Sequence, residues 1–230
     1  MMTPSSFTRD TPGPTVDPPS KPSQAARRPV ESEVDADIRV ACDAGNYGDA
    51  VTALLRCYGD DLMSFLVFRL GDRSAADEAF ALLAEDLWAS LPRFEFRSRV
   101  KTWAYTVATH VASRYARAPH RRRERNLSLS QHGQLSQLVA HVRSRTHRYL
   151  QTEVKSRMGE LREQLAPEDQ LLLVLRVNRQ LSFRDAAMVM LGDPHGVPDA
   201  ELEREAARLR KRFERVKAEL RRMAEQEGLL

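Results

Sequence analysis

Residues 101–123 read KTWAYTVATHVASRYARAPHRRR, and this stretch carries two helical stripes of different character. At 100° per residue, a helix over 100–117 gathers apolar side chains on one face, which predicts its core-facing side. A second stripe beside it is aromatic, polar and cationic. The apolar stripe is Val100, Ala104, Val107, Ala108, Val111 and Tyr115, and the second stripe is Trp103, Thr106, His110, Arg114 and Arg117.

The segment around this helix is strongly cationic. From Arg97 to Arg125 there are nine Lys or Arg residues and a single acid, Glu124. Cations track phosphates and flat rings stack on unpaired bases, so the second stripe suits a nucleic acid strand that leaves a duplex. The alternative is that Trp103 belongs to the core and that the basic residues only compensate the helix dipole.

The composition of the 230 residues favours helices around a modest core. Charged residues make up 30%, apolar residues 42% and aromatic residues only 7%, with 10 glycines. This length holds one large or two small domains. The net charge of +4 is too small to identify a polyanion partner. Whether the chain binds one is therefore judged from the local clustering of its cations.

Cysteine usage and hydropathy favour a cytoplasmic protein with no segment inserted in a membrane. Cys42 and Cys57 match no metal-ligand spacing and suggest no disulfide framework. The sequence has no run of about 18 apolar residues, and its N-terminus lacks the apolar core of a signal peptide.

The N-terminal half is expected to be a disordered tail followed by helices. Seven of the twelve prolines fall within residues 1–35, and such a segment buries too little apolar area to fold. Helical spacing begins near Asp37, and Gly45 and Gly48 are expected to break the first helix. Further helices are expected over 60–70, 72–91 and 100–117, with a loop at 93–99.

The C-terminal half is expected to be a second set of helices behind a linker. Residues 120–147 are interpreted mainly as that linker, with a helical patch around 135–142. One helix is expected from Tyr149 to Leu165. Pro167 then starts a second helix, and Ser182 and Gly192 cap the two ends of a third. The last helix is expected to run from residue 199 to about residue 226.

The last two helices have the form of a helix-turn-helix. LSFRDAAMVMLG, residues 181–192, has a polar cap, two alanines for close packing and a glycine turn. The last helix has an apolar 4-3 repeat, and its acid-free cationic face suits a major groove or a wall of phosphates. A coiled coil of about three heptads is the alternative explanation of that repeat. The repeat is Leu202, Ala206, Leu209, Phe213, Val216, Leu220 and Met223, and the cations are Arg204, Arg208, Lys211, Arg215 and Arg222.

With both halves considered together, the chain resembles an extracytoplasmic-function (ECF) sigma factor of bacterial RNA polymerase, within the sigma-70 family. The resemblance covers about residues 40–123 and 150–225, and the pair of motifs LPRF…TWAY and LSF.DAA..LG is its most specific part. The strings that carry it are YGDDLMSFLVFRLGDRSAADEA (58–79), LWASLPRFEFRSRVKTWAYTVATHVASRYAR (87–117) and LAPEDQLLLVLRVNRQLSFRDAAMVMLG (165–192).

The resemblance implies an all-α fold of two small helical domains joined by a flexible linker. Residues 1–36 would be the tail, 37–123 sigma domain 2, 124–147 the linker and 148–230 sigma domain 4. Sigma domain 2 would bind core polymerase and help to melt the −10 element, and sigma domain 4 would read the −35 element. The implied polymerase contacts are Asp77, Glu78, Leu82 and Glu85. The implied −10 contacts are Arg97, Arg99, Lys101, Trp103, His110, Arg114, Arg117 and Arg121. The implied −35 contacts are Arg204, Arg208, Lys211, Arg212 and Arg215.

The chain departs from the family pattern at three places. Ala81 and Leu82 stand on the docking helix where relatives usually have Gln-Glu. His110 stands where relatives often have an Asn that faces a flipped −10 base. The loop at 192–199 is longer than in most relatives. The residues of the recognition helix that meet the DNA are therefore defined only to within one helical turn.

The sequence favours neither an enzyme nor a cofactor-binding protein. It contains no Gly-rich phosphate loop, no H-E-x-x-H pattern and no Cys/His cluster for a metal. Core RNA polymerase and promoter DNA are the implied partners, with an anti-sigma factor as a further candidate. A helix-turn-helix regulator that binds duplex DNA without polymerase is the alternative function.

Overall fold

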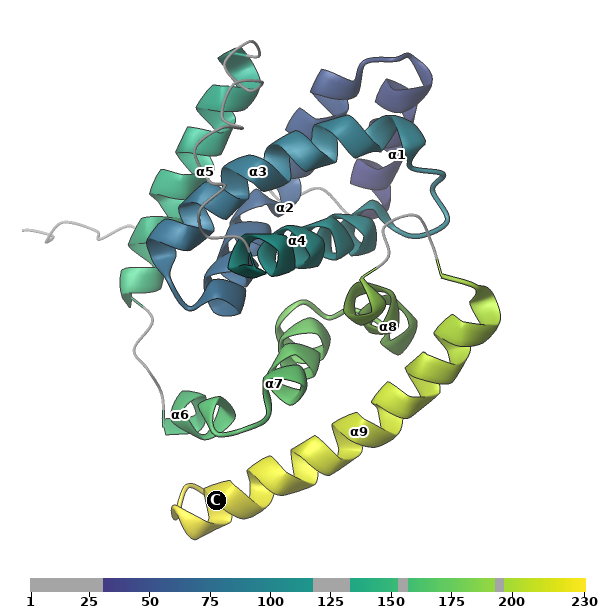
Figure 1. The fold of residues 1–230 in the computed structure, drawn as a ribbon. Coiled ribbons are helices and arrows are strands. Elements are labelled where there is room, and N and C mark those ends of the chain that lie inside the picture. The colour runs from purple at the N-terminus through teal and green to yellow at the C-terminus, as the bar shows by residue number, and fades with distance from the viewer. Residues whose placement is uncertain (1–30, 118–132, 153–156, 193–196) are drawn as a thin grey trace, which may run out of the picture.

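The computed structural model describes residues 31–117, 133–152, 157–192 and 197–230, and within these ranges the chain is helical without strands. The helices form two groups (Figure 1). Four of them, α1 to α4, make a bundle that α5 flanks. The others, α6 to α9, lie along one side of that bundle, with the long α9 outermost. The prediction of an all-α fold is therefore confirmed.

The first two helices are α1 (Glu31–Asp43) and α2 (Tyr47–Leu70). The expected tail therefore ends earlier than predicted, because α1 includes residues 31–36 and buries Val34 in the core. Gly45 separates the two helices in the left-handed conformation at φ 75°, which glycine adopts without strain. The prediction that Gly48 also breaks the helix is wrong, since Gly48 lies in the first turn of α2. Residues 1–30 lie outside the described residues.

The helices α3 (Arg73–Ser90) and α4 (Val100–Arg117) occur where the sequence predicts them. Asp72 caps α3, because its carboxylate accepts a hydrogen bond from the Ala75 amide. A short 3₁₀ turn, η1 (Leu91–Arg93), leads from α3 into the loop that precedes α4. Both helices pack on α2, whose Leu62, Phe65 and Leu66 are fully buried.

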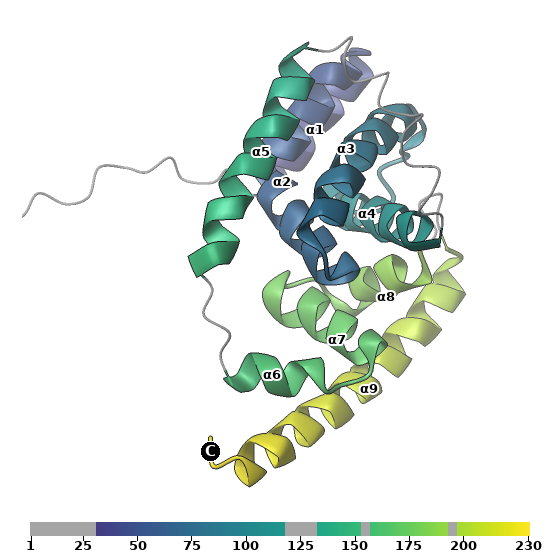
Figure 2. The same ribbon diagram turned by 60° about the vertical axis from the view of Figure 1, so that its left-hand side comes forward.

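The segment expected to be a linker contains a long helix, α5 (Gly133–Thr152). Leu135, Val139 and Val142 recur at helical spacing and are buried against α2 and α3, so apolar burial holds this part of α5 on the bundle (Figure 2). A Cβ at Gly59 in α2 would lie 3.0 Å from Val142 Cγ2, so α5 packs where α2 has no side chain. The structure thus differs from the expected linker at 124–147, of which residues 124–132 lie outside the description.

The remaining helices are α6 (Arg157–Glu163), α7 (Pro167–Leu173), α8 (Phe183–Leu191) and α9 (Asp199–Gln226), with a π-helical turn, η3 (Val174–Asn178), after α7. Pro167 begins α7 as predicted. Of the single helix expected from Tyr149 to Leu165, the first residues belong to α5 and Arg157–Glu163 form α6, which ends before Leu165. Val154, assigned to that helix, lies outside the described residues.

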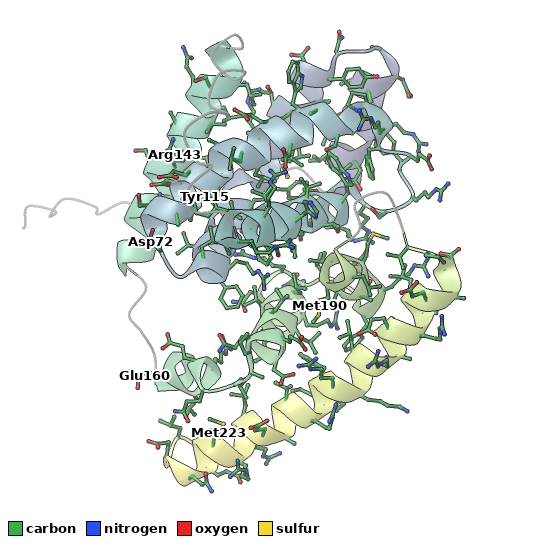
Figure 3. All side chains as sticks on the ribbon, viewed as in Figure 1. Asp72, Tyr115, Arg143, Glu160, Met190 and Met223 are labelled. Carbon is green, nitrogen blue, oxygen red and sulfur yellow. The ribbon has the colours of Figure 1, made fainter. Side chains whose placement is uncertain are left out.

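One apolar core runs through both groups of helices. It contains the α2–α4 side chains together with Leu172 and Leu175, with Ala186 and Val189 of α8, and with Leu202 of α9. A smaller cluster joins Leu161, Leu165 and Leu173 to Val216, Leu220 and Ala224 near the end of α9. In Figure 3 the labelled Met223 lies near the C-terminal end of α9, and the labelled Met190 lies on α8. The two expected domains therefore lie in direct contact.

Candidate nucleic-acid interface

Helix α4 is buried around most of its circumference. Its apolar stripe packs against α2 and α3, and α8 lies against another side of the helix. Thr102, Thr106 and Thr109 are 0%, 1% and 7% exposed, although all three side chains are polar. His110 and Arg117, seven residues apart on one face, are exposed. The part of α4 that is open to a ligand is therefore narrow and cationic.

Trp103 is a core residue in this structure. Its ring is 3% exposed and stacks on Phe94, with ring centroids 4.7 Å apart and planes inclined by 20°. Phe94 in turn contacts Phe96 at 4.6 Å, and the Arg39 guanidinium of α1 lies 4.9 Å from the centre of the Phe96 ring. Trp103 can meet an unpaired base only after Phe94 moves away.

The aromatic stack holds the loop before α4 in a strained conformation. Phe96 has φ 54°, a left-handed value that a bulky side chain rarely adopts. Its contacts with Phe94 and Arg39 offset that strain. Because the stack fixes the backbone, the loop presents Arg97 and Arg99 to solvent beside the start of α4.

The predicted −10 cations differ in their availability. Arg97 is 73% exposed and forms a 2.7 Å ion pair with Glu95, which an exposed pair gives up at small cost. Arg114 is half-buried, and its guanidinium lies 2.6 Å from Asp86 of α3, so it joins two helices. Lys101 is half-buried, and Arg121 lies outside the described residues.

The predicted helix-turn-helix is formed by α8 and α9. The Ser182 hydroxyl accepts a hydrogen bond from the Asp185 amide, and the Asp185 carboxylate accepts one from the Ser182 amide, so the two residues form a capping box at the start of α8. Gly192 ends α8 at φ 72° in the left-handed conformation. Phe183 of α8 meets Phe213 of α9 edge to face, with centroids 5.7 Å apart, so the helices are joined by rings as well as by the turn.

Arg184 links α8 to the first two turns of α9. Its guanidinium bonds both Asp199 and Glu203. The hydrogen bond that Arg184 donates to Asp199 is the main cause that raises the pKa of Arg184 above its ordinary value, and the one it donates to Glu203 is the next. The contact partly neutralises the acidic start of α9, which would otherwise repel a phosphate.

Four of the five predicted −35 cations lie in the open. Arg204, Arg208, Lys211 and Arg215 are exposed on the face of α9 opposite its buried stripe. Arg212 differs, because its Nη1 lies 2.7 Å from Glu168 and its Nε bonds Asp169, both in α7. These hydrogen bonds raise the pKa of Arg212, and the one that Arg212 donates to Asp169 is the larger cause. Arg212 therefore joins α7 to α9.

The apolar 4-3 repeat of α9 is buried within this chain. Leu202 and Leu209 belong to the main core, and Val216 and Leu220 belong to the second cluster. A coiled coil would need this same stripe for a partner helix. The structure therefore assigns the repeat to packing against α6–α8.

The predicted polymerase contacts lie along α3. Glu78 is exposed, and its carboxylate accepts a 2.7 Å hydrogen bond from the Tyr115 hydroxyl. Leu82 and Glu85 are half-buried beside it. Asp77 faces α5 instead, with its carboxylate 3.2 Å from Arg73 and 3.7 Å from Arg143. The edge open to a partner consists of Glu78, Leu82 and Glu85.

Sequence reasoning missed the residues that join distant segments. Arg39, Arg143 and Arg184 carry no local motif. The partners of Arg143 and Arg184 lie on other helices, and the partner of Arg39 lies in the loop before α4. From the sequence RFEFRS is expected to be a loop near the −10 element, and no packing partner is predicted for its two phenylalanines. Their spacing was the one feature of the sequence that could have indicated an aromatic cluster with Trp103, since residues two apart on an extended chain point to the same side.

The described residues offer neither a metal site nor a membrane-spanning helix. No group of three or more His, Cys, Asp or Glu side chains there is arranged to hold a metal ion. Among those same residues, no helix has the length and apolar character needed to cross a membrane.

Comparison with known families gives one match. Residues 54–123 match the family described as sigma-70 region 2. The matched part begins within α2, contains α3 and α4, and extends six residues beyond the described end of α4. No curated protein and no solved structure matches the chain.

Proposed function

Because this chain is a sigma factor of the sigma-70 family, we propose that it directs core RNA polymerase to promoters by contacting both a −10 and a −35 element. Its sigma-70 region 2 supports binding to core polymerase and a role in promoter recognition. The particular elements, the melting step and the contacting residues belong to the proposal.

We assign polymerase docking to the open edge of α3. Glu78, Leu82 and Glu85 combine two carboxylates with an apolar side chain, which suits a basic helical surface. The hydrogen bond from Tyr115 ties Glu78 to α4, so docking and DNA contacts share one rigid support.

We assign the −10 contacts to the loop at 94–99 and the open face of α4. Arg97, Arg99 and Arg117 are exposed cations that can hold phosphates, and His110 is an exposed ring on α4. His110 can stack on an extruded base and can also donate or accept a hydrogen bond. Such contacts offset the few kcal/mol that opening a base pair costs.

We assign the −35 contacts to α9, with α8 as the supporting helix. Arg204 and Arg208, nearest to the start of the helix, are the candidates for base reading, and Lys211 and Arg215 for phosphate contacts. The observation that carries the whole assignment is that a sigma-70 region 2 and a helix-turn-helix with four exposed cations on one helix face occur in one chain.

The test is run-off transcription with core polymerase on a promoter library, with and without this chain. Transcripts that start at a common pair of elements only when the chain is present would support the function. A chain that binds duplex DNA but neither binds core polymerase nor directs transcription would instead be a regulator of the helix-turn-helix class.

A further inference from the structure

We propose that Arg39 of α1 is a positioning residue for the loop at 94–99 and thereby helps to set which bases the chain accepts in the −10 element. The loop follows η1 and leads into α4, and Arg39 reaches it from a different helix. Base selection by the loop rests on the proposed function, whereas the positioning of the loop by Arg39 can be tested without it.

Backbone hydrogen bonds leave the middle of this loop unsupported. The Phe94 amide donates to the Leu91 carbonyl, and the Arg99 carbonyl accepts from the Trp103 amide. Among the described residues, no backbone hydrogen bond joins residues 95–98, which lie between these two bonds, to another part of the chain. The conformation of this segment therefore depends on the contacts of its side chains.

Phe96 is the residue of the loop that most needs such contacts, because its backbone is strained. A φ of 54° is costly for a bulky side chain and persists only where the surrounding structure determines it. The centroid of the Phe96 ring lies 4.6 Å from that of Phe94 and 4.9 Å from the Arg39 guanidinium. Since Phe94 belongs to the same loop, Arg39 is the contact that ties Phe96 to a separate helix.

The contact of Arg39 is too weak to hold the fold together but strong enough to bias the loop. Arg39 is exposed, and a cation–π contact at an exposed site changes a conformational equilibrium about two- to fivefold. Loss of the guanidinium should therefore leave the helices intact and let the loop leave its fixed shape more often. This combination is what distinguishes a positioning residue from a residue that the bundle needs in order to fold.

A loop of fixed shape holds its cations in fixed places relative to α4. Arg97 and Arg99 are exposed and follow directly on Phe96, so their placement depends on its backbone. Flexible surfaces that can repack accept more partners than rigid ones. Loosening the loop should therefore relax the choice of −10 bases more than it weakens binding in general.

The first measurement is tryptic cleavage after Arg99, timed by mass spectrometry, since a protease cuts a loop in proportion to its open population. Each rate is divided by the rate of a free peptide of residues 90–103 that carries the same loop substitution. The chains compared are the natural one, Arg39→Ala, Arg39→Lys, Phe96→Leu and the Arg39→Ala, Phe96→Leu double variant. Arg56→Ala is the matched control, because it removes an exposed arginine from α2.

We expect Arg39→Ala to raise the relative cleavage rate about two- to fivefold, and Arg39→Lys to stay closer to the natural chain because an ammonium can also lie over the ring. In the Phe96→Leu chain the same change at Arg39 should add little, because the ring is already gone. Arg56→Ala should match the natural chain. Equal rates in the natural chain, Arg39→Ala and Phe96→Leu overturn the proposal. A natural chain that is cut as fast as the free peptide overturns it as well.

The second measurement is run-off transcription with core polymerase on templates that carry each base at each −10 position of a promoter found with the library. Arg39→Ala should lower the preference for the best base about two- to fivefold at one position or more, and should leave the salt dependence of promoter binding unchanged. Arg39→Lys should retain most of the preference. An equal loss on all templates, with a salt slope smaller by about 0.7–0.9, would make Arg39 a phosphate contact and overturn the proposal.

The two measurements separate this proposal from the proposed function. Cleavage as expected, with no transcription from the natural chain, would support the positioning of the loop and reject the sigma function together with base selection. Cleavage as expected, with an unchanged base preference, would overturn the role of Arg39 in base selection. Transcription from the natural chain, with cleavage that no variant changes, would reject the positioning and leave the sigma function standing.

Discussion

At the scale of single residues, burial separates the two halves of the predicted −10 stripe. Trp103 lies beneath Phe94, and Thr106 is 1% exposed, whereas His110 and Arg117 face solvent. A ring that faces solvent without a packing role is available to a base. His110 is therefore the residue whose removal tests the −10 assignment without damaging the core.

We predict that His110→Ala reduces transcription from a duplex promoter about tenfold more than from a template with a pre-melted −10 bubble. The loss of one base–ring contact, worth about 1–3 kcal/mol, affects the step in which bases leave the duplex. The measurement is run-off transcription on matched duplex and bubble templates. An equal loss on both templates would mean that His110 takes no part in melting. A natural level on both would make it an uninvolved surface residue.

At the scale of elements, close approaches decide which helices stay together. α5 packs at Gly59 of α2, and α7 is tied to α9 by the ion pairs of Arg212. In both contacts the sequence around the key residue, Gly59 or Arg212, does not indicate the long-range partner. Each can be tested with a matched residue on the same helix.

We predict that Gly59→Leu lowers the free energy of unfolding by about 1–3 kcal/mol, since its side chain would overlap Val142. Val142→Ala added to Gly59→Leu should recover part of the loss, because it removes the overlapping methyl groups. Gly48→Leu is the control, since nothing lies within 4 Å of a Cβ there, and it should not destabilise. Urea unfolding followed by circular dichroism measures all three. Equal losses at Gly59 and Gly48 would contradict the close approach of α5.

A second matched pair separates structure from DNA binding on α9. Arg212→Ala should lower the free energy of unfolding by about 1–3 kcal/mol, because it leaves Glu168 and Asp169 without their partner. Arg208→Ala should leave stability within about 0.5 kcal/mol and weaken binding to −35 duplexes, since its side chain is 81% exposed. Thermal unfolding and duplex titrations give the two readouts. The reverse pattern would exchange the roles assigned to the two arginines.

At the scale of the whole molecule, the chain presents three charged surfaces from one body. The acidic edge of α3, the cations around α4 and the cationic face of α9 lie on different helices that share a core. Polymerase docking is the surface that can be tested without knowing the promoter.

We predict that Glu78→Lys combined with Glu85→Lys weakens binding to core polymerase about tenfold or more, because it reverses the charge of the docking edge. Since Glu78 also accepts a hydrogen bond from Tyr115, Tyr115→Phe is the control for that bond and should bind normally. Affinity is measured by pull-down or titration, and circular dichroism checks the helical content. Unchanged affinity with normal helicity would remove α3 from the docking surface.

The sequence by itself determined most of the helices and their ends. Pro167, Ser182 and Gly192 act where they were predicted, because the signals that start or cap a helix involve residues only a few positions away. The buried and exposed faces of α9 also follow from its own spacing. The exposure of Arg204, Arg208, Lys211 and Arg215 could be predicted for the same reason.

Only the tertiary structure decided what those faces meet. It placed Trp103 in the core, tied Arg212 to α7, packed α5 on α2 and joined α8 to α4 at Thr102. The periodicity of a helix predicts which of its faces is apolar or polar. It does not predict which other helix or loop packs against that face. The contacts that chose the partners join residues 83 and 118 positions apart, and their energy depends on how all the helices fill space together.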